Sequence, residues 1–261
     1  MAKLTILSSG AGGSEYLTTQ ALKALQDAQV VVSYTKYAKE LKELIKDKEL
    51  YTSGMTQEIQ RCQVAIDYAK SGKDTCIISN GDVNVFGMAT LIVELIDKQD
   101  LWEIIELESI AGVTSFLAAA SLVGAPVSQD FAIISLSDRL TDISLIQKRV
   151  DLALEGDFII GIYNPKSKKR TKPYINLLQS LQNHPKRVAI IASNVGRDKQ
   201  QVTITDTKEL VAQGLEHPQV TMSTLIIIGN STTRLTKNNL VLTPRGYLNK
   251  YELDGKIKES K

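Results

Sequence analysis

The sequence predicts an α/β protein made of two α/β domains with mostly parallel sheets. Apolar runs of strand length alternate with amphipathic segments along the 261 residues, which indicates this class. Several runs are solid in Val, Ile and Leu, as in strands that are covered on both faces. The runs are too numerous for one simple wound sheet, which favours two domains.

Each apolar run marks one expected strand. In chain order these are Leu4–Leu7, Val30–Tyr34, Cys76–Ser79, Glu103–Leu107, Phe131–Leu136, Asp157–Tyr163, Arg187–Ala192, Val202–Thr205 and Thr224–Gly229. Amphipathic patterns between them predict helices, most clearly at Glu15–Ala28, Glu58–Gly72 and Ile143–Gly156. The last two end in glycine, a common C-terminal stop. A further helical pattern begins at Phe86.

The domain boundary is expected between Gly112 and Asp130, where Pro126 lies near the middle of the chain. We place the first domain at residues 1–118 and the second at 119–250. Residues 251–261 form a charged tail that we expect to be frayed.

Composition excludes several classes of function. A formal net charge of +2 predicts no strong field, so nucleic acid is not an expected partner. No apolar run approaches the length that crosses a bilayer. Two cysteines without metal spacing and two histidines argue against a Cys/His zinc site. A cytoplasmic, soluble protein without a metal centre is therefore expected.

A glycine-rich loop, "GAGGSE", follows the first expected strand. A dinucleotide-binding loop needs a third glycine where Glu15 stands, and no carboxylate follows Tyr34 to hold a ribose. The Gly-Lys-Ser/Thr of a P-loop is also absent. Two interpretations stay open, a tight strand-to-helix turn or a close approach of the backbone to a flat or bulky ligand.

Two further polar loops follow expected strands. "NGDVNVFG" could bind a ligand through Gly81 and Asp82, or Asp82 or Asn84 could cap the next helix. "AGVTSF" offers Thr114 and Ser115, which could equally be helix caps. Three such loops in one half of the chain suggest a shared crevice.

Taken together, the motifs resemble the tetrapyrrole (class III, S-adenosylmethionine-dependent) methyltransferase family. They stand in the family order over roughly Leu4 to Tyr247: "GAGGSEYLTTQAL", "SGMTQEIQR", "NGDVNVFGMA", "AGVTSFLAAASLVGAPVSQDFAIISLSDRLT", "IYNPKSKKR", "ASNVGRDKQQVTITDTKEL", "MSTLIIIGNS" and "TPRGY". "ISLSD", "YNPKSKKR" and "TPRGY" favour the precorrin-3B C(17)-methyltransferase and cobalt-factor III methyltransferase subfamily.

The resemblance implies an enzyme of cobalamin biosynthesis that methylates C-17 of a precorrin or cobalt-precorrin and assists ring contraction. It implies S-adenosylmethionine as cofactor, bound in a cofactor cleft between the two domains, and a homodimer. A non-catalytic tetrapyrrole-binding protein and a family methyltransferase with another substrate are the alternatives. Whether the substrate carries cobalt, and whether the route uses oxygen, stays open.

By position, the resemblance also assigns site residues. The expected cofactor contacts are Gly81, Asp82, Val85, Thr114, Ser115, Tyr163, Asn164, Asn194 and Val195. The expected substrate contacts are Gly10, Ala11, Gly12, Asp138, Arg139, Lys168, Arg170 and Arg245, in which Arg and Lys would bind carboxylates. No catalytic acid or base is assigned, because the sulfonium already activates the methyl group.

The departures from the family pattern fall in these loops. Ser8, Ala11, Gly13, Val83, Asn84, Ala111 and Gln129 stand where the family has Gly, Pro, Asp, Pro, Gly, Pro and His. Losing three prolines predicts a less preorganised cleft. Asn84 adds a side chain near the expected cofactor, and Gln129 removes one proton carrier.

Overall fold

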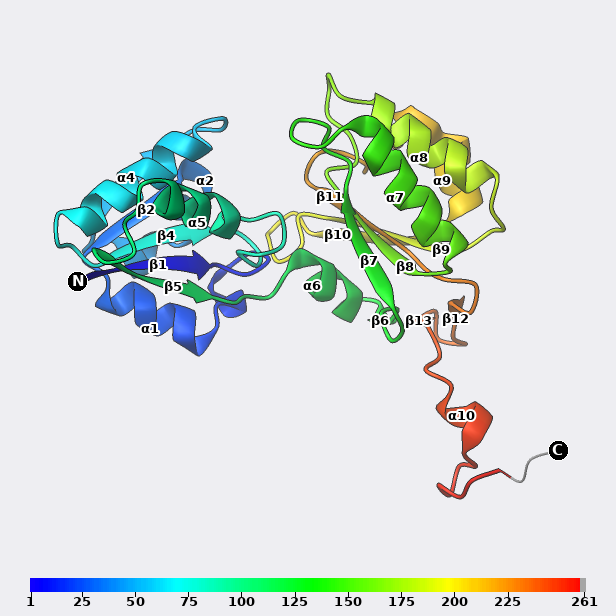
Figure 1. The fold of residues 1–261 in the computed structure, drawn as a ribbon. Helices are drawn as coiled ribbons and strands as arrows, with labels where there is room; N and C mark the ends of the chain where they lie inside the picture. The colour runs from blue at the N-terminus through cyan, green and yellow to red at the C-terminus, as the bar shows by residue number, and fades with distance from the viewer. Residues whose placement is uncertain (259–261) are drawn as a thin grey trace. The chain divides into compact units, whose positions relative to one another are not determined.

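The structure is a computed structural model that describes residues 1–258. The chain divides into two compact units. The first unit comprises Met1–Ala118 together with the short segment Val195–Asp198, and the second unit holds Ala119–Asn194 and the chain from Lys199 onward. Each unit is a sheet with helices packed on it (Figure 1), so the predicted α/β class is confirmed. The inclusion of Val195–Asp198 in the first unit was not predicted.

The first unit contains a five-stranded parallel sheet in the order β3-β2-β4-β1-β5. Its strands are β1 (Ala2–Ser8), β2 (Val30–Tyr34), β3 (Glu49–Ser53), β4 (Thr75–Ser79) and β5 (Ile105–Ile110). The prediction missed β3, because "ELYTS" is a largely exposed edge strand without an apolar run. It also placed the fifth strand too early, at Glu103–Leu107.

Helices cover both faces of this sheet, which explains the solid apolar runs. Leu4 and Ile6 of β1 pack in one core cluster with α4 (Glu58–Lys70) and α5 (Ala89–Lys98). Leu7 packs in the opposite cluster with α1 (Thr19–Asp27), α2 (Thr35–Glu40) and α3 (Lys42–Ile45). The short 3-10 helix η1 (Ser14–Tyr16) precedes α1, so the expected helix from Glu15 is two separate elements.

The second unit contains a five-stranded sheet in the order β10-β9-β11-β8-β7. Its strands are β7 (Phe131–Ser135), β8 (Ile159–Tyr163), β9 (Val188–Ser193), β10 (Gln201–Asp206) and β11 (Thr224–Ile228). Within this five-stranded sheet only β7 and β8 pair in parallel, so the expectation of a mostly parallel sheet is wrong here. A short connection without a helix joins β9 to β10, and parallel neighbours need a longer crossover.

Further elements complete the second unit. Its core cluster lies between the sheet and the helices α7 (Ile143–Glu155), α8 (Lys172–Gln182) and α9 (Thr207–Gln213). The remaining elements are α6 (Ser115–Ser121), which spans the boundary between the units, η2 (Gly214–Glu216), α10 (Tyr247–Lys250), and a small sheet of β12 (Arg234–Leu235), β13 (Val241–Leu242) and β6 (Gly124–Ala125). Within residues 1–258, no helix is long and apolar enough to cross a membrane.

Strand direction brings the expected ligand loops together within each unit. In the first unit the carboxyl ends of β1, β4 and β5 lie at one edge, because these neighbours are parallel. In the second unit β8 and β9 are both antiparallel to β11 and therefore run the same way, as does β7. Open α/β sheets bind ligands at such edges.

Candidate cofactor and substrate site

Backbone hydrogen bonds fasten the first two loops of the first unit to each other. Gly10 and Gly81 exchange both of their backbone bonds, at 3.1 and 2.7 Å, and the N–H of Ser9 donates to the carbonyl of Ser79 at 2.8 Å. Gly10 and Gly81 both have positive φ, of 74° and 71°. Glycine adopts this backbone conformation readily, which explains its use at both positions.

The hydroxyl of Ser8 connects the ends of three strands. It donates to the carbonyl of Ile110 at 2.6 Å and accepts from the N–H of Val83 at 2.9 Å, and the residue is fully buried. A Cβ on Gly112 would lie 2.4 Å from the Ser8 Cβ, so the third loop packs closely on this serine. The serine at a family glycine position therefore adds a bond between loops.

Asp82 links the second loop to the third. One carboxylate oxygen accepts from the N–H of Asn84 at 2.8 Å, and the other accepts from the N–H of Gly112 at 2.9 Å. The N-cap of α5 is Met88, without a side-chain bond, and α5 starts at Ala89. The helix-cap alternative for Asp82 and Asn84 is therefore wrong, as is the expected helix start at Phe86.

Gly81 is buried, but it has room for a Cβ atom. A Cβ placed on it would have its nearest neighbour, Thr114 Cα, at 4.0 Å. Asp82 beside it is half-buried, and each of its oxygens keeps accepting capacity beyond the bond it makes. Val85 donates its N–H to the carbonyl of Asp82, while Thr114 is buried and Ser115 begins α6. Their contacts with a cofactor stay predictions.

The Gly10–Gly13 loop makes its close backbone approach within the protein. Gly10, Ala11 and Gly12 are buried. A Cβ on Gly12 would lie 2.0 Å from the carbonyl oxygen of Gly196, and the N–H of Gly13 donates to that oxygen at 3.0 Å. Gly12 is therefore required for packing against residue 196, and a contact of this loop with substrate stays a prediction.

In the second unit, two asparagines in the left-handed region follow strands. Asn164 after β8 has φ 51°, and Asn194 after β9 has φ 52°. Phe86 in the first unit has φ 54°, which is a costlier conformation for a bulky residue. Only Asn164 and Asn194 directly follow strands, and residues in this conformation are often found at functional sites, which supports the expected ligand role of these two.

Arg170 is used inside its own loop. Its guanidinium donates to the carbonyls of Leu136 at 2.5 Å and Asn164 at 2.8 Å, and it lies 3.9 Å from Asp138. Burial lowers the pKa of Arg170, and Asp138 opposes this shift. Arg170 thus joins the residues that follow β7 and β8, and two of its five N–H donors are bonded to backbone carbonyls.

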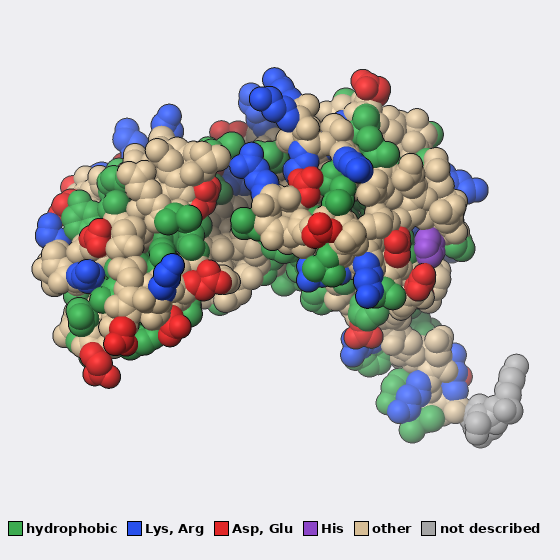
Figure 2. Space-filling view, turned by 45° about the horizontal axis from the view of Figure 1, so that its top comes forward, with side chains coloured by type: hydrophobic (Ala, Val, Ile, Leu, Met, Phe, Trp, Pro, Cys, Tyr) green, Lys and Arg blue, Asp and Glu red, His purple; other side chains and the backbone are tan. Residues whose placement is uncertain are grey.

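A basic hollow of about 840 Å³ lies beside this loop. Arg139, Lys168 and Lys169 line it, are exposed, and make no hydrogen bond or ion pair with the described residues. Lys166 also lines it but donates to the carbonyl of Leu215. Lys and Arg side chains project together at the upper edge of Figure 2. Arg139 and Lys168, predicted separately, thus lie around one hollow.

Two other predicted positions have different surroundings. Arg245 donates to the carbonyl of Ser128 at 3.1 Å and does not line the basic hollow. Gln129 donates to the carbonyl of Pro244 at 2.6 Å and accepts from the side-chain amide of Asn230 at 2.8 Å. Gln129 therefore ties two segments of the second unit together, at a position where the family has histidine.

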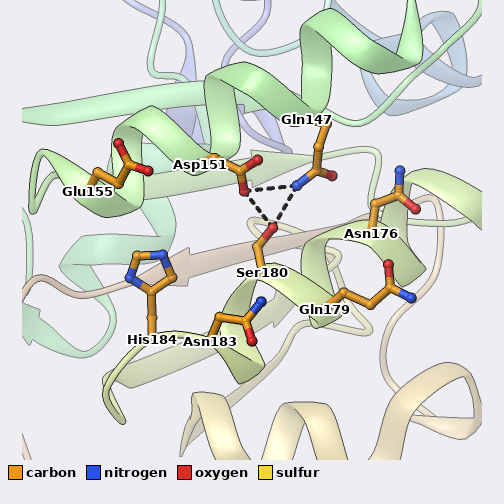
Figure 3. A pocket seen from close by; sticks show the side chains of 8 residues that line it. All are labelled: Gln147, Asp151, Glu155, Asn176, Gln179, Ser180, Asn183 and His184. Carbon is orange, nitrogen blue, oxygen red and sulfur yellow. Dashed lines mark hydrogen bonds between the residues drawn. The ribbon is translucent and has the colours of Figure 1, made fainter.

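A second hollow, of about 510 Å³, lies between α7 and α8. Figure 3 shows Gln147, Asp151 and Ser180 joined in a triangle, in which the Gln147 amide and the Ser180 hydroxyl donate to the same oxygen of Asp151 at 2.8 and 2.6 Å. No predicted site residue lines this hollow.

Sequence reasoning missed two contributors to these loops. Ser8 was identified only as a departure from the family pattern, because the neighbouring sequence does not show which backbone groups its hydroxyl will bond to. Arg197 was not singled out, although it lies in the loop that carries Val195 and its guanidinium contacts two other predicted loops. A lone arginine directly after Gly196 was the available signal.

Comparisons with known proteins agree with the resemblance. A sequence profile of the family Tetrapyrrole (Corrin/Porphyrin) Methylases matches residues 3–211. The "Probable cobalt-factor III C(17)-methyltransferase" of Salmonella typhimurium is 39% identical over 94% of this chain and 99% of its own length. The "Cobalt-factor III methyltransferase" of Priestia megaterium is 37% identical, but this chain spans only 46% of it. The crystal structure of the methyltransferase CobJ superposes with a TM-score of 0.85 at 28% identity, covering 94% of this chain and 100% of that one.

Proposed function

Because the chain belongs to the tetrapyrrole methylase family, we propose that it is an S-adenosylmethionine-dependent methyltransferase of cobalamin biosynthesis. In this proposal it methylates C-17 of a precorrin or cobalt-precorrin and assists ring contraction. The name of the Salmonella typhimurium relative, which aligns over almost its whole length, supports the substrate class. The observation that carries the proposal is the half-buried carboxylate of Asp82 in the loop after β4, whose two oxygens keep accepting capacity.

The residues at this edge fit the proposed cofactor. The remaining lone pairs of Asp82 can accept hydrogen bonds from ribose hydroxyls or from an ammonium group. Asp82 and Gly112 hold each other, so these acceptors are fixed in place before a ligand arrives.

When bound, S-adenosylmethionine supplies a methyl group that its sulfonium has already activated. The chain's own part is to hold the two reactants in line and to exclude water. Loops fastened by Ser8, Asp82 and the Gly10–Gly81 bonds suit that task, because positioning requires little movement of the backbone. No side chain is assigned as an acid or base.

The basic hollow of the second unit supports an anionic substrate. Arg139 and Lys168 have donors that no described residue uses, and the peripheral carboxylates of a tetrapyrrole would pair with such groups. The proposal also includes a homodimer and a cytoplasmic location, both of which rest on the family resemblance.

Calorimetry with S-adenosylhomocysteine, the demethylated cofactor product, tests the proposal. We expect binding by the wild-type protein and a loss of at least about tenfold in affinity for Asp82→Ala, because removing two hydrogen bonds to backbone N–H groups frees both loops. Asp97→Ala is the control, since the carboxylate of Asp97 on α5 accepts, within residues 1–258, only from the indole N–H of Trp102.

Folded wild-type protein that does not bind S-adenosylhomocysteine at millimolar concentration would contradict the proposal. Mass spectrometry then distinguishes an enzyme from a tetrapyrrole-binding protein. Addition of one methyl group to a supplied precorrin is expected, and binding of the precorrin without that addition would favour the non-catalytic alternative.

A further inference from the structure

The segment Val195–Asp198 leaves the second unit between β9 and β10 and packs within the first. Its contact with the Gly10–Gly13 loop is too close for side chains. Gly196 has φ +70°, and a Cβ on it would lie 2.7 Å from the Tyr16 ring and 3.1 Å from the Gly12 backbone. The segment is therefore held at a defined place.

The guanidinium of Arg197 fastens this segment. Nε and one Nη2 proton form a bidentate pair with the carboxylate of Glu40, at 2.8 and 3.1 Å. Nη1 donates to the carbonyl of Ala11 at 2.8 Å, and Nη2 also donates to the side-chain oxygen of Asn80 at 2.6 Å. A longer bond of 3.4 Å from Nη1 reaches the carbonyl of Val195.

These bonds use all of the donors that an arginine side chain has. Arg197 therefore has none left for a carboxylate of a substrate, unlike Arg139. Its partners identify its role instead, since Asn80 directly precedes Gly81 and Asp82, and Ala11 lies in the Gly10–Gly13 loop. One planar group connects three segments that carry expected ligand contacts.

We propose that Arg197, held by Glu40, is a positioning residue for cofactor binding, an inference that rests on the proposed function. The pair fixes the Gly10–Gly13 loop, Asn80 and Val195 relative to one another, and Asn80 in turn directly precedes Gly81 and Asp82. Lysine cannot replace it, because one ammonium lacks the planar fork that reaches Glu40, Ala11 and Asn80 together.

The test compares Arg197→Lys with a matched control, Arg187→Lys. Arg187 of the second unit also pairs with a carboxylate, that of Asp157 at 3.0 Å, and donates to the carbonyl of Leu154 at 2.9 Å. Thermal unfolding and calorimetry with S-adenosylhomocysteine are measured for both. We expect both variants to lose thermal stability, and only Arg197→Lys to lose affinity, by tenfold or more.

Hydrogen–deuterium exchange of the unliganded proteins gives a readout that needs no ligand. Peptides covering residues 9–16 and 80–88 are expected to exchange faster in Arg197→Lys and to be unchanged in Arg187→Lys. Should Arg197→Lys fail to fold, Glu40→Gln replaces it, because a glutamine keeps one acceptor and removes the charge. A threefold or larger loss of affinity is expected for that variant.

Two results would overturn the inference. One is an affinity of folded Arg197→Lys, or of Glu40→Gln in its place, within twofold of wild type. The other is unchanged exchange in both peptides. Failure of the wild-type protein to bind S-adenosylhomocysteine is a different result, since it contradicts the proposed function and removes the cofactor role from Arg197 with it.

Discussion

The strand ends of the first unit and those of the second unit differ in how their loops are held. In the first unit, hydrogen bonds between the loops hold these loops to one another at the edge of the sheet. The bonds are made by Ser8, Asp82 and the Gly10–Gly81 pair. In the second unit, Arg139 and Lys168 stand free around a hollow. The first edge offers fixed backbone and one carboxylate, whereas the second offers exposed positive charge.

This difference matches two recognition tasks. A cofactor that must present its methyl group in line needs a rigid surface, because small displacements are costly to the rate. The carboxylate arms of a large substrate are flexible, and long cationic side chains can follow them. The comparison predicts that damage to the first edge affects stability and cofactor binding, whereas damage to the second affects substrate binding and its dependence on salt.

The strongest test of the comparison is Ser8→Ala. The variant leaves the carbonyl of Ile110 and the N–H of Val83 buried without their partner, and we expect a loss of about 2 kcal/mol in the free energy of unfolding. The affinity for S-adenosylhomocysteine should fall with it. Urea denaturation measures the first quantity and calorimetry the second.

Ser33→Ala is the matched control for Ser8→Ala. Ser33 is buried in β2 of the same sheet, but its hydroxyl reaches only the carbonyl of the adjacent Tyr34. For Ser33→Ala we expect a smaller loss in the free energy of unfolding and no change in the affinity for S-adenosylhomocysteine. Equal effects of the two substitutions would show that Ser8 fills space without joining the loops.

A smaller effect is expected from Arg139→Ala and Lys168→Ala in the second unit. Exposed ion pairs contribute little, so each substitution should raise the KM for the tetrapyrrole about three- to fivefold. Affinity for S-adenosylhomocysteine should not change. The difference from wild type should shrink as salt is added, because salt screens exposed charges.

Lys148→Ala on α7 is the control for these two substitutions, since Lys148 is exposed and does not line the basic hollow. A change in the KM equal to that of Lys168→Ala would mean that net charge alone attracts the substrate. A salt-independent change would mean that the hollow acts through packing. Either result would contradict the proposal that the second edge, unlike the first, recognises its ligand through exposed charges.

Much of the first unit could be predicted from the sequence, because its strands are short apolar runs covered on both faces. Val31 packs to one side of the sheet and Val32 to the other, and a continuous run of valine reports that directly. Whether neighbouring strands of the second unit are parallel or antiparallel could not be predicted in this way. β9 and β11 are equally apolar, and an interior strand looks the same whether its neighbours are parallel or antiparallel.

The candidate site was predictable to the level of loops and no further. The apolar run Cys76–Ser79 placed Gly81 and Asp82 after a strand, and the structure has them there, after β4. The partners of these residues were not predictable. Arg197 reaches Glu40 across 157 residues of sequence, and no local pattern encodes such a contact. Side-chain networks of this kind depend on the packed structure as a whole.

The smallest expected effect concerns His217, a buried residue in the wall of the basic hollow. Burial, and after it the charge of Lys166, lowers the pKa of His217 below its ordinary value of 6.5. The unfolded chain therefore binds this proton more readily than the folded protein does. The stabilising contribution is complete above pH 6.5 and is lost as the pH falls below that value.

The variant His217→Asn tests this, because it removes the titrating group. Asparagine keeps an acceptor for the N–H of Gln219, which donates to His217 Nδ1 at 3.2 Å in the wild type. Urea midpoints measured from about pH 7.5 to about pH 5.5 should fall more for wild type than for this variant. Parallel curves would show that the hollow does not shift the pKa of His217. They would also indicate that the lysine and arginine side chains around the hollow remain solvated.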